Sequence, residues 1–531
     1  MRLAPLVLVA LVAWAGGQAA HASDELISAD AIGDVQPGDW AYQALAELGR
    51  QHGCRAAAGL VGERNLATAR PLTRAEAAAL LQTCLPSLQR PTDASQRLLA
   101  QFADELEQLK GRQQQVSRQL EELSAQAFSA TTRLSIESFW VAGGNSYSGN
   151  AINTATNTYG VPVNGTNVNF VLPNGVSFNY DVRLNFSTSW TGKDLLYTRL
   201  RSGNFFPSSG FGNYPNLNMA ILDAAYGSSS IVLIDRLYYR FPIGNSVSVM
   251  VGPRLRNTEI LGFRPQAYDG ILDFFTLAGA PTVYNKANGA GAGFSWKQSV
   301  PKGRPYWIGA ISYVAELGNV GDPAYGGLFS ANGANNVNLQ LGGRGNNWAL
   351  AAGYRYGTCF TDSRSGTALV MSIYTLYCND LAPGNNASSH SIALGGYWQP
   401  MNHGWWPAVS LGWGYSSWNQ SAELNSLPAN SAIVSATQSW AAMLQWNNIA
   451  GRGNAAGLAV GQGTMATALR TGATPVDGNV AMEGWYRFRL SDAISITPAI
   501  FYLSNPLGQV LAGQGLQLNN LGLLIQTRFQ F

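Results

Sequence analysis

The sequence predicts a mainly β protein, whose largest part is a sixteen-stranded transmembrane antiparallel β-barrel preceded by a small α-helical domain and a short coiled coil. Three observations support this prediction. Of the 531 residues, 11% are aromatic, only 12% are charged, and 59 are glycines. Residues 128–531 contain many short segments in which apolar and polar residues alternate. Short and long connections between these segments alternate in turn, which is the loop pattern of membrane-spanning barrels.

Composition excludes several other classes of protein. A net charge of only +3 with abundant aromatic residues is unlike a disordered chain. The mean hydropathy of −0.03 is low for a helical membrane protein, and after the N-terminus no apolar run approaches the ~20 residues of a spanning helix. The sequence contains no nucleophile elbow, no phosphate-binding glycine loop and no zinc-protease motif. We therefore expect no catalytic activity, no cofactor, no metal ion and no nucleic-acid partner.

The N-terminus has the features of a secretory signal peptide over residues 1–22. A positive start at Arg2 precedes the apolar stretch Leu3–Gly16, and Ala20–Ala22 supplies a small-x-small cleavage site. A retained membrane helix is the alternative, but the apolar stretch is short for one. Export permits disulfides. We expect two local pairs, with free buried thiols as the alternative: Cys54 with Cys84, and Cys359 with Cys378.

Residues 31–88 predict a small helical domain. Asp39 can cap a helix over 40–50, and Thr73 can cap a second helix whose residues 77–85 face inward. The Asp-Val-x-x-x-x-Trp-Ala opening and the Thr-Arg-Ala-Glu start resemble a surface-layer homology (SLH) domain. That resemblance implies a pocket for cell-wall polysaccharide, formed by Asp34, Trp40, Arg74 and Glu76. In the alternative interpretation Trp40 is a core residue, and Arg74 and Glu76 only cap a helix.

Residues 93–127 predict a coiled coil. Apolar residues recur with spacings of three and four over four heptads, and Gln113 is the polar exception. The seam consists of Leu99, Phe102, Leu106, Leu109, Gln113, Val116, Leu120, Leu123 and Ala127. The seam predicts association of several chains, but it lacks the β-branched pattern that would distinguish a dimer from a trimer.

The strand pattern is clearest over Phe178–Trp190, where one face is apolar with aromatic ends and the other is polar. A soluble β-sandwich would show the same alternation. The connections decide between them, because seven short turns alternate with eight longer loops and thus define sixteen strands. An even strand number with short turns on one side is typical of outer-membrane barrels. Sixteen strands enclose an aqueous lumen.

Basic residues outnumber acidic ones in the predicted barrel, by 22 to 16. With the aromatic-rich face toward lipid, the expected pore-lining residues are Arg183, Arg199, Arg201, Arg254, Arg256, Arg355, Arg487, Arg489, Arg528, Asp181 and Glu483. Inward guanidinium groups favour anions; alternatively, these arginines only keep the lumen hydrated. The third long loop, 258–289, is expected to fold inward and narrow the pore with Glu259, Asp269 and Asp273.

The whole arrangement resembles the cyanobacterial outer-membrane porins that are named as carbohydrate-selective (OprB-type) or iron-uptake porins. The resemblance implies a homotrimer in the cell outer membrane, with outer-membrane lipid around the barrel. It also implies a periplasmic N-terminal domain that binds peptidoglycan or a linked cell-wall polysaccharide. The expected function is passive diffusion of small hydrophilic solutes and inorganic ions. The sequence leaves open which solute the channel carries. A structural tether with a narrow or plugged barrel is the alternative. We expect His390 and His403 to be ordinary turn residues.

Overall fold

The computed structural model describes residues 35–52, 71–85, 92–126, 131–153, 155–156, 158–163, 166–206, 209–212, 217–358, 364–371, 387–401, 405–419 and 433–531. Residues 1–127 and 128–531 form two compact units. No helix in the described part of the chain has the length and apolar character needed to cross a bilayer. The predicted signal peptide, Asp34, Cys54, Cys359, Cys378 and His403 lie outside the described residues, whereas Cys84 is disulfide-bonded.

The N-terminal unit packs short helices around an apolar core. Its described helices are α1 (Trp40–His52), α3 (Arg74–Cys84), α4 (Asp93–Gln101) and α5 (Ala103–Gln126). Helix α3 begins with a capping box, in which Thr73 Oγ1 accepts from the Glu76 amide and the Glu76 carboxylate accepts from the Thr73 amide. The core between the helices includes the buried side chains of Leu45, Leu72, Leu81, Leu98 and Phe102.

The predicted coiled-coil seam is interrupted at Phe102. Helix α4 ends there, because Phe102 leaves the helical conformation with φ −109° and ψ 22°. Phe102 is buried in the core of the N-terminal unit, and Leu99, Leu106 and Leu109 pack against that core. The first part of the seam therefore stabilises the unit itself. A coiled coil of several chains stays a prediction for the later part, from Gln113 onward.

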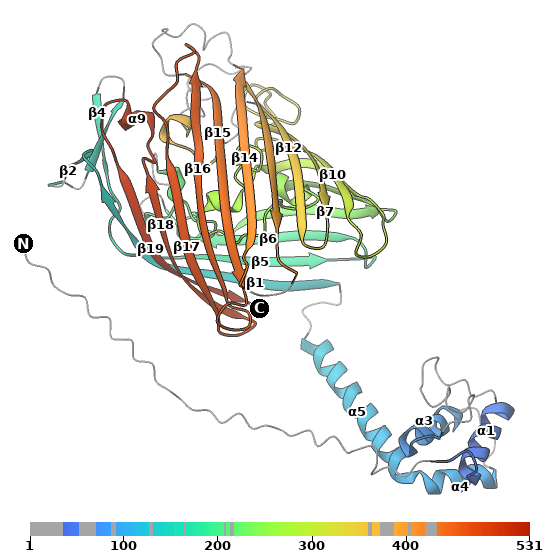
Figure 1. Cartoon of the computed structure of the whole chain (residues 1–531). Helices are drawn as coiled ribbons and strands as arrows, with labels where there is room; N and C mark the ends of the chain where they lie inside the picture. The colour runs from blue at the N-terminus through green and yellow to red at the C-terminus, as the bar shows by residue number, and fades with distance from the viewer. Residues whose placement is uncertain are drawn as a thin grey trace, which may run out of the picture. The chain divides into compact units, whose positions relative to one another are not determined.

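The second unit is a closed antiparallel barrel of sixteen strands, which confirms the predicted fold class (Figure 1). In chain order its strands are β1 (Thr132–Ser148), β5 (Ser177–Thr188), β6 (Leu195–Gly203), β7 (Leu233–Ile243), β8 (Val247–Arg256), β9 (Asn288–Lys297), β10 (Tyr306–Ala315), β11 (Asn335–Arg344), β12 (Trp348–Thr358), β13 (Ser388–Trp398), β14 (Ala408–Asn419), β15 (Val434–Asn447), β16 (Ala455–Leu469), β17 (Val480–Arg489), β18 (Ile494–Ser504) and β19 (Asn519–Gln530). Each strand pairs with its sequence neighbour, and β19 closes the barrel against β1.

Short turns and long loops alternate around the barrel. The short turn 189–194 joins β5 to β6, for example, whereas the long loop 257–287 joins β8 to β9. The loop after β1 carries a three-stranded sheet that the sequence pattern did not predict, formed by β2 (Ile152–Asn153), β3 (Thr158–Val163) and β4 (Thr166–Val171). This sheet packs through Tyr159 on Leu507 and Leu511, beside helix α9 (Gln509–Ala512).

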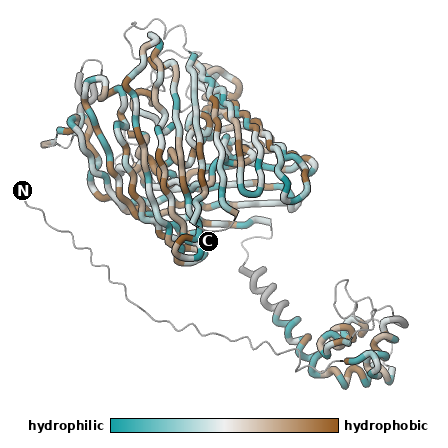
Figure 2. Tube along the Cα trace, viewed as in Figure 1, coloured by the Kyte–Doolittle hydropathy of each residue, from teal (hydrophilic) through white to brown (hydrophobic). Residues whose placement is uncertain are grey.

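The outer wall of the barrel is apolar. On β19, Leu523 and Ile525 are 64% and 52% exposed, whereas Leu524 between them is 2% exposed. Hydrophobic and hydrophilic positions alternate along the barrel strands in Figure 2. Apolar side chains on the outside of a closed barrel fit a lipid environment. Closure also pairs every strand edge, so no backbone group faces the lipid without a hydrogen-bond partner. Part of the interior is also dry, since Phe274 and Phe275 of the loop 257–287 pack against Trp485 and Phe501.

Candidate functional site

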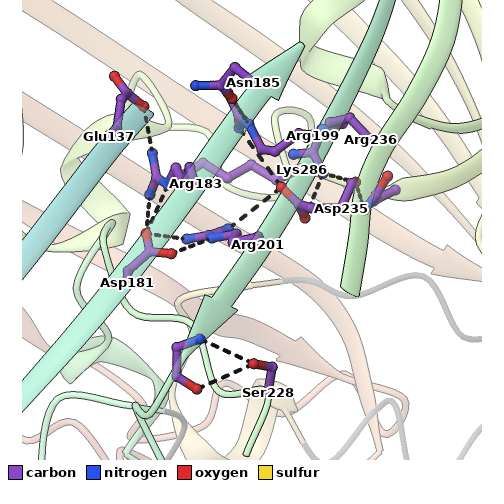
Figure 3. A network of polar contacts seen from close by, with 12 residues as sticks. Glu137, Asp181, Arg183, Asn185, Arg199, Arg201, Ser228, Asp235, Arg236 and Lys286 are labelled. Carbon is purple, nitrogen blue, oxygen red and sulfur yellow. Dashed lines mark hydrogen bonds and ion pairs between the residues drawn. The ribbon is translucent and has the colours of Figure 1, made fainter. Parts of the chain in front are cut away.

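A buried carboxylate organises the inner wall on strands β5 and β6. Asp181, whose side chain is fully buried, accepts hydrogen bonds from Arg201 Nε at 2.7 Å and Nη2 at 2.9 Å. Arg183 Nη2 lies 2.7 Å from the same carboxylate (Figure 3). A bidentate contact with a second guanidinium beside it holds both arginines in a fixed position. The alternation pattern places these three side chains on the inward face, and the structure brings them into contact.

A second acidic residue, Asp235, holds the next arginines along the wall. Because the register shifts between Arg199 and Leu200, no residue of β6 lies opposite Asp235 in the strand pairing, and both Asp235 and Arg236 are buried. Asp235 lies 2.8 Å from Arg236 Nη1 and 3.8 Å from Arg199 Nη1. Arg236 Nε also donates to Glu259 at 2.9 Å, which ties the loop 257–287 to this wall. An extra residue in one strand thus reorients a charged side chain.

Strand β1 contributes an acidic group where it pairs with β19 and closes the barrel. Arg528 Nη2 donates to Glu137 Oε1 at 2.5 Å, and Arg183 Nη1 lies 3.7 Å from Glu137 Oε2. Both guanidinium groups also lie over the ring of Phe139, at 4.6 Å for Arg183 and 5.5 Å for Arg528. The carboxylate of Glu137 and the ring of Phe139 together fix the two guanidinium groups of the strands that flank β1.

The loop 257–287 lies against the inside of the opposite wall. Ser410 on β14 and Gln445 on β15 accept hydrogen bonds from the backbone amides of Ala267 and Asp269, at 2.9 and 2.8 Å. Glu483 on β17 accepts from Tyr268 Oη at 2.8 Å and from the Leu272 amide at 2.7 Å. Further contacts of the loop with the wall are Ser439 with Gly279, Asn338 with Val283 and Gln340 with Phe263. The loop is therefore held along several strands and not only at its ends.

A partly buried ion cluster joins this loop to two others. Lys286 Nζ lies 2.6 Å from Asp273 and 2.5 Å from Asp223 of the loop after β6. Arg364, from the loop after β12, donates to Asp273 at 2.5 Å. Burial raises the pKa of Asp273, but Arg364 and Lys286 outweigh burial and lower that pKa to about 2. Burial lowers the pKa of Lys286, and the two carboxylates oppose this effect.

A cavity of about 210 Å³ lies between the loop and the wall that carries the arginines. It is lined by charged groups of both signs from β1, β5, β17, β19 and two loops. The charged lining residues are Glu137, Arg183, Asp223, Arg264, Asp269, Arg487 and Arg528. Arg487 Nη1 contacts Asp269 at 3.0 Å across this space. The arrangement gives a narrow space in which charged groups of opposite sign face one another.

The other expected pore-lining residues have different surroundings. Arg355 is fully buried and donates to Asn336 at 3.0 Å, and Glu483 is buried beneath the loop. Arg256 is partly buried, and Arg254 is exposed next to a register shift in β8. Arg489 pairs with Asp492 in the turn after β17. Burial and pairing thus differ widely among residues that the alternation pattern treats alike.

In the N-terminal unit, the residues expected to bind glycan are not equivalent. Arg74 Nε contacts Glu105 Oε1 of α5 at 2.5 Å, and its Nη2 donates to the Gln101 carbonyl at 2.7 Å. The carboxylate of Glu76 is used in the capping box. Trp40 is 46% exposed. Of these residues, Trp40 presents the largest surface that a ligand can contact.

Sequence reasoning missed several charged residues of the cavity and the ion cluster. Glu137, Asp223, Asp235, Arg264, Lys286 and Arg364 were not among the expected site residues. Glu137 shares its inward face with Phe139 and Val141, so a rule that turns the apolar face toward lipid points it outward. Lys286 and Arg364 lie in loops, where no alternation exists to orient a side chain. No group of three or more His, Cys, Asp or Glu residues suited to a metal ion occurs within the described residues.

Comparisons with known proteins give one match to a family model, described as "Carbohydrate-selective porin, OprB family", over residues 90–531. An uncharacterized protein of Nostoc sp. is 29% identical and covers 92% of this chain and 83% of its own length. An uncharacterized protein of Synechocystis sp. is 27% identical, with 91% and 88% covered. Among solved structures, OprB of Pseudomonas putida at high pH is 11% identical, with a TM-score of 0.46 over 76% of this chain and 94% of that chain.

Proposed function

Because the chain belongs to the OprB family of carbohydrate-selective porins and is thus an outer-membrane channel rather than an enzyme, we propose that it carries small hydrophilic solutes and inorganic ions. Transport is passive diffusion through the space between the loop 257–287 and the arginine-bearing wall. The observation that carries this proposal is the 210 Å³ cavity, whose lining is charged while the outer wall of the barrel is apolar. We further propose that the N-terminal unit tethers the barrel to peptidoglycan.

The charge distribution supports a preference for anions. Four arginines and three carboxylates line the cavity. Fixed charges in a narrow space with apolar surroundings act more strongly on a passing ion than the same charges in bulk water. Because arginine cannot be deprotonated in proteins, the preference should persist at high pH.

Swelling of liposomes that contain the purified chain tests the channel proposal. We expect swelling in small neutral sugars, and the rate should fall steeply with solute size because the loop narrows the lumen. Removal of residues 263–283 should raise the rate for the larger sugars. Liposomes that do not swell in any solute would overturn the proposal, provided that the barrel strands are present by circular dichroism.

The exposed indole of Trp40 and the resemblance of residues 31–88 to an SLH domain support the tether. An indole face packs on the apolar face of a sugar ring. Deletion of residues 31–88 should abolish sedimentation of the protein with isolated peptidoglycan and leave conductance unchanged. Trp40→Ala in the full chain should weaken sedimentation without loss of the helical signal. Wall binding that survives the deletion would contradict the tether.

A homotrimer is the assembly that we propose. After Gln113, the later part of the seam continues at three-and-four spacing with the apolar residues Val116, Leu120, Leu123 and Ala127, which supports association through α5. Chemical cross-linking in native membranes should yield a trimer. The trimer band should weaken when Leu120 and Leu123 are replaced by Asp. Cross-linking that yields only monomers, or only dimers, contradicts this assembly.

A second candidate function is a structural anchor with a plugged barrel. The apolar cluster of Phe274 and Phe275 with Trp485 and Phe501 favours it, because this part of the interior excludes water. An anchor of this kind binds peptidoglycan but carries no ionic current. Conductance therefore separates the two functions, whereas wall binding is common to both.

A further inference from the structure

The outer wall of the barrel carries an apolar groove that crosses strands β10 to β15 (Figure 1). Its volume is about 950 Å³, and none of its lining residues is charged. Four tryptophans line it, namely Trp307, Trp348, Trp413 and Trp440. The other lining residues include five glycines and four alanines, so the wall is hollowed between bulky rings.

Alternation of large and small residues across neighbouring strands forms the groove. Directly paired residues follow one another from β10 to β15 in the order Trp307, Gly343, Leu350, Gly396, Leu411 and Ala442. Leu350 and Leu411 are 63% and 58% exposed, so this row faces lipid. At Gly343, the indoles of Trp307 and Trp348 both lie 3.7 Å from the position that a Cβ atom would take. The small residues therefore leave hollows between large side chains.

The groove has the depth of one lipid leaflet. It begins near the short turns, at Trp307 close to the start of β10, and reaches Trp413, five residues after the first residue of β14. At ~3.4 Å per residue, this distance is about 17 Å along the strand. A strand tilt of about 40° reduces it to roughly 13 Å along the membrane normal, against about 15 Å for half of the hydrocarbon core. Because short turns lie on the periplasmic side, the groove matches the periplasmic leaflet.

Basic residues surround the end of the groove at the short turns. Lys297 Nζ lies 4.4 Å from the ring centre of Tyr306, which lines the groove, and Arg344 is the strand partner of Tyr306. Lys302 and Arg304 are exposed in the turn before Tyr306. None of these four basic side chains forms an ion pair within the described residues. The turns between β9 and β10 and between β11 and β12 contain no Asp or Glu, so the protein leaves this positive charge uncompensated.

We propose that the groove binds an acyl chain of one anionic phospholipid of the periplasmic leaflet, whose acidic head group lies at Lys302 and Arg304. A chain seated between large side chains makes dispersion contacts on several sides, whereas a flat wall contacts it on one. Basic residues at the membrane surface attract acidic head groups, and tryptophans such as Trp307 are typical of the membrane interface. A second copy of the chain is the other occupant of such a face, but the uncompensated positive charge favours an acidic lipid. Binding of this lipid does not require conduction.

Native mass spectrometry of the full chain in detergent tests the head-group part of the proposal. Dioleoylphosphatidylglycerol is the anionic probe, and dioleoylphosphatidylcholine is the zwitterionic probe with the same acyl chains. We expect the chain to bind phosphatidylglycerol at least tenfold more tightly than phosphatidylcholine, and Lys302→Gln with Arg304→Gln should remove this preference. Arg452→Gln is the charge control, because Arg452 is exposed in the turn after β15 and does not line the groove. It should keep the preference. Equal binding of the two lipids to the unaltered chain would overturn the proposal.

Filling the groove tests the acyl-chain part. Ala352→Leu with Ala442→Leu occupies two hollows and keeps the wall apolar, so phosphatidylglycerol should bind at least fivefold more weakly. Ala292→Leu is the matched control, because Ala292 is exposed on β9 but does not line the groove, and its affinity should stay within twofold. Circular dichroism checks the barrel strands of each variant. Unchanged phosphatidylglycerol binding in the folded double variant would overturn the proposal. If that variant also loses its cross-linked oligomers, the groove is a contact between copies of the chain.

Discussion

Tyr268 Oη donates a 2.8 Å hydrogen bond to Glu483, although the two residues lie 215 positions apart. The same carboxylate accepts from the amides of Ile271 and Leu272, at 3.1 and 2.7 Å. One buried side chain on strand β17 thus holds three residues of the loop 257–287: Tyr268 by its hydroxyl group, and Ile271 and Leu272 by their backbone amides. Because a buried carboxylate is stable only when hydrogen-bonded, strand and loop depend on each other.

Replacement of Glu483 by Gln should loosen the inner loop. A Gln side chain has one acceptor oxygen and turns an amide NH₂ toward backbone N–H donors, so at least one buried donor loses its partner. The cost is about 1–3 kcal/mol of local stability. In planar bilayers we expect larger and noisier current steps than for the unaltered chain. Tyr268→Phe removes one of the three hydrogen bonds to Glu483 and should increase the size and noise of the current steps less than Glu483→Gln does. Steps of unchanged size and noise in Glu483→Gln contradict this role.

Acid should release the loop through Asp273. Its pKa is lowered to about 2 in the folded chain, against about 3.9 for an unperturbed Asp. A lowered pKa stabilises the fold at pH values above about 4, and this contribution is lost as the pH falls toward 2. Single-channel current should therefore change between pH 4 and 2. Asp273→Asn should show the altered current already at pH 7 and should lose this pH dependence. If the current of Asp273→Asn still changes between pH 4 and 2 as it does in the unaltered chain, Asp273 is not the group that titrates.

Asp477 should hold three outer loops together. Its buried carboxylate accepts from Thr367 Oγ1 at 2.7 Å and from the amides of Ala466 and Gln509 at 2.6 and 2.8 Å. Asp477→Ala leaves buried donors without partners, which costs about 1–3 kcal/mol each. Limited proteolysis of the loops 470–479 and 505–518 should become several-fold faster. Asp492→Ala, at a side chain that is 97% exposed, is the control and should leave the cleavage rate unchanged.

The ion pair between Arg74 and Glu105 should contribute modestly to the N-terminal unit. Their side chains are 33% and 20% exposed, so solvent screens the pair. A double-mutant cycle of Arg74→Ala and Glu105→Ala, read from thermal unfolding of the helical signal, should give a coupling of about 0.2–1 kcal/mol. Peptidoglycan sedimentation gives a second readout. If Arg74 also binds glycan, Arg74→Ala should weaken sedimentation more than Glu105→Ala; equal effects mean that the residue is only structural.

The sequence was informative about the barrel because its signals are local. Alternation over Phe178–Trp190 and the spacing of short turns depend on neighbouring residues, and both recur in the structure as β5 and its turn. Interior contacts depend on distant segments, so Glu483 could be assigned to the inner face but not to its partner Tyr268. The extra residue at Asp235 also reverses which side chains of β7 point inward. A strict inward-outward alternation along the sequence cannot reveal such a register shift. The alternation therefore indicated which strand residues point inward, but not the charged residues of the loops or the pairs that the inner residues form.

The zero-current potential of the purified chain in a planar bilayer, across a tenfold KCl gradient, tests the central claim most directly. The barrel with its narrowed, arginine-bearing lumen predicts stable current steps and a potential displaced toward the chloride equilibrium value. A bilayer that shows no current above the lipid background, although the inserted chain is folded, would contradict the account.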